Sequence, residues 1–158
     1  SGVLTAIAVS PVVTVNAADG SGANVVSPTT AVTGSTNNFL TFTYTAAAGG
    51  MNNGEIRITV PAGWTTPQTT NNTLPGYVTH TTGGISISGN DIVISALTLA
   101  ASGTLTVRYG DTQSGTQPGA AAAAPGAAET STFTTQQKST ATSTLTNIAT
   151  SPTVVVSP

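Results

Sequence analysis

Apolar and hydroxyl-bearing residues alternate along most of this chain with a period of two. In Leu40–Thr45, Leu40, Phe42 and Tyr44 share one parity, and threonines occupy the other. Such alternation is typical of antiparallel strands that have one buried and one solvated face. The same pattern predicts further strands over residues 55–60, 84–88, 91–95, 104–109, 132–135 and 154–156.

Turn residues separate these segments, at 49–54, 61–63, 89–91 and 102–103. Strands that recur about every 8–12 residues between such turns are typical of sandwiches and barrels. We therefore expect an all-β fold, an Ig-like antiparallel β-sandwich over 24–158, with an extra N-terminal strand over 1–15. The Gly/Ser/Ala-rich residues 16–23 predict a flexible linker between the two. Residues 111–128 predict a long exposed loop, which is a candidate interaction surface because loops of that length are uncommon without a role.

The apolar segment at the N-terminus is nearly repeated at the C-terminus. Residues 4–15 are LTAIAVSPVVTV and residues 145–156 are LTNIATSPTVVV, which gives 8 identities in 12 positions at an offset of 141. A period of that length suits one whole sandwich module rather than one rung of a solenoid. One sandwich should need the strand only once.

Three arrangements would explain the repeat. The first copy is the last strand of a preceding module in a tandem array, a strand donated to a separate neighbouring subunit, or a second strand packed within the same sandwich. Unpaired apolar strands favour addition to a sheet edge. Use across units is therefore the preferred interpretation, with inter-unit contacts through Leu4, Ile7, Val9, Val13 and Val15. Pro11 cannot donate to a ladder, which indicates an edge position or a break at that point.

Composition excludes several classes of function. Charged residues make up 5% of the chain, with net charge −2, and the cations Arg57, Arg108 and Lys138 are scattered in sequence. Nucleic-acid binding and attraction to an anionic membrane both need clustered cations. There is no cysteine and no apolar run of 18 residues, so we expect neither disulfides nor membrane insertion. Threonine supplies about a fifth of the residues, which favours a β-rich extracellular protein.

Candidate catalytic and metal sites are weak. His80 is the sole histidine and lies on the polar parity of its segment, so no serine-type triad is expected. Five dispersed acids do not predict an acid/base pair, and Asp19 lacks a second local carboxylate for calcium. A Lys–Asn isopeptide at Lys138 would need a buried acid beside it, and the acids lie far away in sequence. We expect no enzyme activity, no metal and no cofactor.

Two features point to glycans. Asn71-Asn72-Thr73 is an acceptor sequon on Asn71, and the abundant Thr and Ser could carry O-glycans. Trp64 and Tyr77 are the candidate ligand contacts of a carbohydrate-binding or adhesin module, although a single Trp in a sandwich more often lies in or beside the core. Thr-x-Thr stretches such as Thr41–Thr45 predict a solvated sheet face rather than an ice-binding array.

The segment from Ile56 to Trp64, IRITVPAGW, resembles the strand-and-turn element of bacterial tandem Ig-like β-sandwich repeats from large secreted surface or fibre proteins. Flanking residues 40–46 and 97–105 are similar to neighbouring strands of those repeats, and the likeness extends over about 24–156. The resemblance implies secretion and a part in building stalks, adhesins or fibres, with no catalytic residues to carry over. We therefore expect a building block of an extracellular filament or stalk that has itself as partner. The alternative is a carbohydrate-binding or adhesin module of the cell surface.

Overall fold

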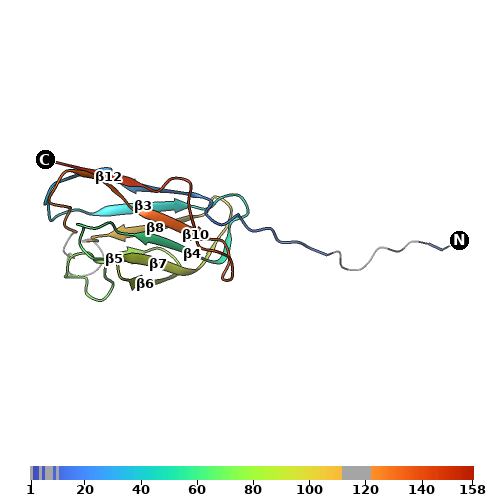
Figure 1. The fold of residues 1–158 in the computed structure, drawn as a ribbon. Helices are drawn as coiled ribbons and strands as arrows, with labels where there is room; N and C mark the ends of the chain where they lie inside the picture. Colours follow the sequence, from blue (N-terminus) through green and yellow to red (C-terminus); the bar gives the residue numbers. More distant parts are fainter. Residues whose placement is uncertain (1, 4, 6–8, 10, 112–121) are drawn as a thin grey trace.

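The structure is a computed structural model that describes residues 2, 3, 5, 9, 11–111 and 122–158. The described residues form twelve β-strands and no helix. Figure 1 shows the strands lying close to one long axis, with residues 11–15 leaving one end of the body and the C-terminus at the other.

The strands form three hydrogen-bonded sheets. The first has the order β1-β3-β8-β5, the second β11-β10-β4-β7-β6 and the third β2-β12-β9. Their bounds are β1 Ala23–Ser27, β2 Thr30–Val32, β3 Leu40–Thr45, β4 Met51–Thr59, β5 Val78–His80, β6 Gly84–Ser88, β7 Asp91–Leu99, β8 Thr104–Tyr109, β9 Glu129–Thr132, β10 Thr134–Lys138, β11 Thr146–Asn147 and β12 Thr153–Ser157.

Two short connections join the third sheet to the others. Only Phe133 separates β9 from β10, and residues 28–29 separate β1 from β2 after a cis Ser27–Pro28 bond. All pairings are antiparallel except that of β12 with β2. The described residues thus form an all-β sandwich, as predicted.

One core holds the sandwich together. Its aromatic centre is Phe133, whose ring lies 5.0 Å from that of Phe42 and 5.5 Å from that of Trp64. Around it pack alternate aliphatic residues of β3, β4, β7, β8 and β12. The alternation read from the sequence is confirmed in β3, where Leu40, Phe42 and Tyr44 are buried and the threonines between them are half-buried.

Two expectations of the sequence were wrong in detail. The turn predicted over 49–54 ends early, because β4 begins at Met51 and continues through a bulge at Gly54. A Cβ at Gly54 would collide with the carbonyl of Lys138, so glycine allows the two strands to approach there. The described part of the loop predicted over 111–128 is not all exposed: Ala122 and Ala124 are buried, and residues 112–121 lie outside the described residues.

Candidate functional site

The most exposed large apolar side chains of the described residues belong to the N-terminal segment, residues 1–15. Val9 and Val13 are each 83% exposed and Val15 is 75% exposed. The first described residue that hydrogen-bonds to the body is Ala17, whose N–H donates to the carbonyl of Gly50. The predicted contact residues Val9, Val13 and Val15 are therefore free for a partner outside their own sandwich, and Leu4 and Ile7 lie outside the described residues.

The C-terminal copy, residues 145–156, is built into the sandwich. Its Val154 and Val156 are 0% and 2% exposed, and Ile148 is buried as well. β11 pairs with β10, and β12 lies between β9 and β2, so this copy has strands to pair with at both of its ends. The C-terminal copy therefore already occupies, within its own sandwich, the position that this strand sequence fits.

Residues 16–22, which we call the polar anchor, attach the C-terminal end of the N-terminal segment to the sandwich. We expected a flexible linker here, but these residues hydrogen-bond to the end of the sandwich. The N–H of Gly20 donates to the carbonyl of Gln137, and the Oγ of Ser139 donates to the carbonyl of Ala17. The phenol of Tyr44 donates to the carbonyl of Ser21 at 2.9 Å, and burial raises the pKa of Tyr44 to about 12.

Asp19 is the centre of that anchor. Its carboxylate accepts bonds from the N–H groups of Ser139 and Thr144 and from the hydroxyl of Ser143, each at 2.8 Å. Desolvation raises the pKa of Asp19, but the bonds from Ser139, Ser143 and Thr144 favour the ionised form more, so the net pKa is lowered. The carboxylate considered as a calcium ligand is instead a cap for the 139–144 turn.

Gln137 is a buried contributor to this anchor that the sequence did not single out. It is 0% exposed, its Oε1 accepts from the N–H of Ser21, and its Nε2 donates to the hydroxyl of Ser139. Its place on the inward parity of β10, between the buried Thr135 and Ser139, was the available signal.

The structure also brings together charges that are dispersed in sequence. Glu55 on β4 contacts both Arg57, at 3.1 Å, and Lys138 on β10, at 3.3 Å, while Arg57 lies 3.7 Å from Asp91 on β7. The acids lie far from Lys138 in sequence, but the pairing of β10 with β4 brings Glu55 beside it. The Lys138 amine contacts Glu55 and the carbonyl of Ala141, which gives the cluster the character of a partly exposed ion-pair network.

Trp64 and Tyr77 do not form an open sugar-binding face. Trp64 is 6% exposed, its indole N–H donates to the hydroxyl of Ser131 at 2.8 Å, and its ring packs against Phe133. Tyr77 is half-buried. The prediction of Trp64 as a core residue is confirmed, and its prediction as a ligand contact was wrong.

Two remaining candidates lie at the surface. Asn71 and Thr73 of the sequon are exposed, and the Oδ1 of Asn71 accepts from the N–H and hydroxyl of Thr73. His80 is half-buried and its Nε2 lies 2.9 Å from the carbonyl of Gly83. In the part of the chain that the structure describes, no group of three acidic or histidine side chains could hold a metal, and no helix is long and apolar enough to cross a membrane.

Comparison with known proteins gives no assignment. No protein-family model, curated protein or solved structure matches this chain. The resemblance to tandem surface repeats therefore stays a prediction, and the interaction properties of the N-terminal segment have to be argued from its own residues.

Proposed function

We propose that this chain is a structural building block of an extracellular filament or stalk, in which the N-terminal segment of one unit adds as a β-strand to a neighbouring unit. The neighbour is either a separate subunit or the preceding module of a tandem array. The observation that carries the proposal is the contrast between two nearly identical segments: Val154 is fully buried, whereas its counterpart Val13 is 83% exposed.

Physical chemistry supports use of this segment across units. An exposed strand-forming segment gains both backbone hydrogen bonds and apolar burial when it adds to a sheet edge. Burial contributes about 1.5–3 kcal/mol for each large aliphatic side chain. Head-to-tail contacts of this kind produce open filaments when the rotation between successive units does not close a ring.

The rest of the molecule is compatible with a mechanical role. Most of the hydrophilic surface is made of hydroxyl and amide groups, and the chain carries only 5% charged residues. Cohesion that rests on strand pairing and apolar burial should depend little on salt, because few ion pairs are available to be screened. The buried position of Trp64 removes the feature that would have favoured the carbohydrate-binding alternative.

Removal of residues 1–15 tests the proposal. Because hydrogen bonding to the body begins at Ala17, the truncated chain should retain the urea unfolding midpoint of the intact chain. It should not form filaments or higher oligomers in electron microscopy and sedimentation. A full-length control with Val9, Val13 and Val15 all changed to serine separates loss of apolar contact from loss of length, and should also fail to assemble. Assembly of the truncated chain at the concentration that suffices for the intact chain would contradict the proposal.

A further inference from the structure

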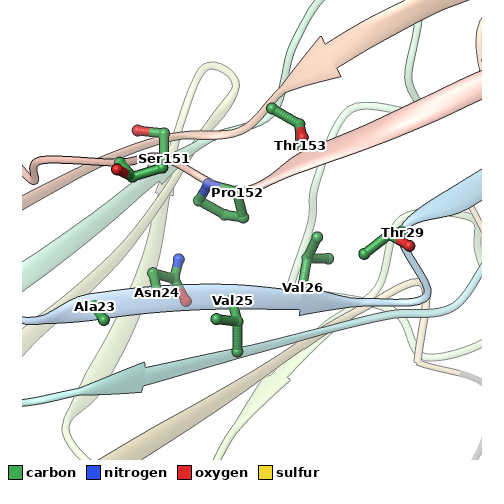
Figure 2. A pocket seen from close by; sticks show the side chains of 9 residues that line it. Ala23, Asn24, Val25, Val26, Thr29, Ser151, Pro152 and Thr153 are labelled. Atoms are coloured by element: carbon green, nitrogen blue, oxygen red, sulfur yellow. The ribbon is translucent and has the colours of Figure 1, made fainter.

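An apolar groove opens beside β1, at the edge of the first sheet. It has a volume of about 370 Å³ and lies between β1 and the 150–153 segment that leads into β12; its lining includes Ala23, Asn24, Val26, Thr150, Pro152 and Thr153. Figure 2 shows Asn24 and Val26 rising from β1 toward Pro152, while Val25 points to the opposite side. The groove separates two parts of the sandwich that no strand of the described chain bridges at this point.

The groove presents unsatisfied hydrogen-bonding groups. β1 pairs with β3 along one side and with no described strand along the other, which leaves an open ladder edge. Asn24 is only 5% exposed, and its Nδ2 donates to the hydroxyl of Thr135, but its Oδ1 is buried without a partner among the described residues. Buried amide oxygens are rarely left unpaired, so an N–H group that reached this atom would satisfy it.

Exposed aliphatic side chains also lie on the strands that flank this groove, with Val25 on the face of β1 that points away from Pro152. Val25 of β1, Val32 of β2 and Val155 of β12 are 61%, 58% and 46% exposed, respectively. Outside residues 1–15, Leu74 is the one other large apolar side chain as exposed among the described residues. An occupant that suits this region must be apolar, uncharged and able to pair with a strand.

Residues 1–15 meet each of these requirements. The odd-numbered positions from 3 to 15 are Val, Thr, Ile, Val, Pro, Val and Val, so an extended segment would present a mainly aliphatic face that is interrupted at Thr5 and Pro11. The segment contains no charged side chain, and neither does the lining of the groove. At about 3.3 Å per residue, 15 extended residues reach about 50 Å, which is sufficient to lie on another unit.

The anchor favours another unit over the chain's own groove. Residues 17–22 cross the end of the sandwich from Gly50 to the start of β1, so the N-terminal segment leaves from the side of β4. Figure 1 shows residues 11–15 continuing away from the body at that end.

We propose that the groove between β1 and residues 150–153 is the acceptor site for the N-terminal segment of a second copy of this chain. The inference rests on the proposed function and names its binding site. The donated strand pairs with the open edge of β1, turns its aliphatic face toward Val26 and Pro152, and brings backbone N–H groups within reach of the Oδ1 of Asn24. One added strand thereby bridges the first sheet and the 150–153 segment.

Disulfide trapping tests this placement, since the chain has no cysteine of its own. A donor chain carries one cysteine placed in turn at Val9, Val12 or Val13, and an acceptor chain of distinguishable mass carries Thr150→Cys. The matched control acceptor carries Ser88→Cys, which is equally exposed but lies on β6 at the far edge of the second sheet. After mixing and mild oxidation, the Thr150→Cys acceptor should give at least about ten times more covalent heterodimer than the Ser88→Cys acceptor for at least one donor position.

The outcomes separate this inference from the proposed function. Equal or greater trapping at Ser88→Cys, with assembly still dependent on residues 1–15, overturns the groove and leaves the filament proposal standing. Intramolecular disulfide in a chain that carries both Val13→Cys and Thr150→Cys, with no heterodimer from the mixed chains, places the segment in its own groove and overturns both.

A second pair of variants tests the same site without relying on disulfide geometry. Thr150→Arg adds a long cation at the exposed rim of the groove, whereas Ser88→Arg adds one on β6. Both should keep the unfolding midpoint of the unmodified chain, because both sites are exposed. Thr150→Arg should raise the concentration needed for assembly at least about tenfold and Ser88→Arg should leave it unchanged; equal effects would overturn the inference.

Discussion

Residues 4–15 and 145–156 differ at four of twelve positions, yet their described valines occupy opposite environments. In the C-terminal copy, Val154 and Val156 are 0% and 2% exposed, while their counterparts Val13 and Val15 are 83% and 75% exposed. Both copies contain the same serine-proline step, at Ser10-Pro11 and at Ser151-Pro152. Local strand propensity is thus nearly equal in the two.

The difference shows that the availability of neighbouring strands decides whether this segment is buried or exposed. β12 lies between β9 and β2, and both of its neighbours belong to the same chain. The N-terminal copy has the same need for neighbours and no such position left in its own sandwich. A segment that is buried when partners exist and exposed when they do not is expected to bind where new partners become available.

The largest expected effect comes from placing one carboxylate in each copy. Val154→Asp should lower the free energy of unfolding by about 3–5 kcal/mol, because an unpaired charge would replace a fully buried side chain. Val13→Asp should change it by less than about 0.5 kcal/mol, because that side chain is exposed in the unassembled chain. Urea unfolding of dilute, unassembled protein measures both. A comparable loss in the two variants would mean that the N-terminal segment packs within its own sandwich.

A smaller effect distinguishes the two faces of the N-terminal segment. Val9 and Val12 have opposite parity, and the C-terminal copy carries threonine at both equivalent positions, Thr150 and Thr153. Val9→Thr should weaken assembly about tenfold, because a hydroxyl buried without a partner costs about 1–3 kcal/mol. Val12→Thr should change the concentration needed for assembly less than about twofold, as measured by sedimentation. The reverse order would show that the other face is buried.

The smallest effect concerns the anchor between the copies. Asp19→Ala removes the acceptor of three hydrogen bonds and should lower the free energy of unfolding by on the order of 1 kcal/mol at pH 7. The pKa of Asp19 is lowered in the folded chain, so its contribution is present above the ordinary aspartate range, near 4, and is lost as pH falls through the folded pKa.

Urea unfolding between pH 7 and pH 2.5 should therefore show the gap between the intact chain and Asp19→Ala closing in acid. Ser143→Ala, which removes only one of the three bonds, serves as the intermediate control. A gap that stays constant down to pH 2.5 would argue that the ionised carboxylate does not stabilise the anchor.

The strands were predictable from the sequence, whereas the polar anchor at residues 16–22 was not, for a physical reason. β3, β6 and β8 follow from alternation alone, because each has one face toward the core and one toward solvent. The anchor was taken for a linker because glycine and serine carry no periodicity. Most of its hydrogen bonds go to Gln137, Ser139 and Thr144, more than 100 residues away, and no local pattern reports such partners.

The candidate site was predictable only in part. The near-repeat of residues 4–15 at 145–156 predicts a spare strand from the sequence alone. The groove beside β1 was not predictable, because it arises where residues 23–26 of one sheet face residues 150–153 of another part of the chain. The proximity of Glu55 to Lys138 likewise depends on the pairing of β4 with β10.

Amide hydrogen exchange of the assembled and dissociated protein, read by mass spectrometry on peptides covering 9–15 and 23–27, tests the central claim most directly. In the dissociated chain residues 11–15, which are exposed, should exchange readily, and so should the amides on the open edge of β1, whereas those that face β3 should be protected. On assembly, both should gain protection together, while a control peptide over β6 should not change. An assembled state in which residues 9–15 still exchange as fast as in the dissociated chain would contradict the claim that this segment serves as the strand of a neighbour.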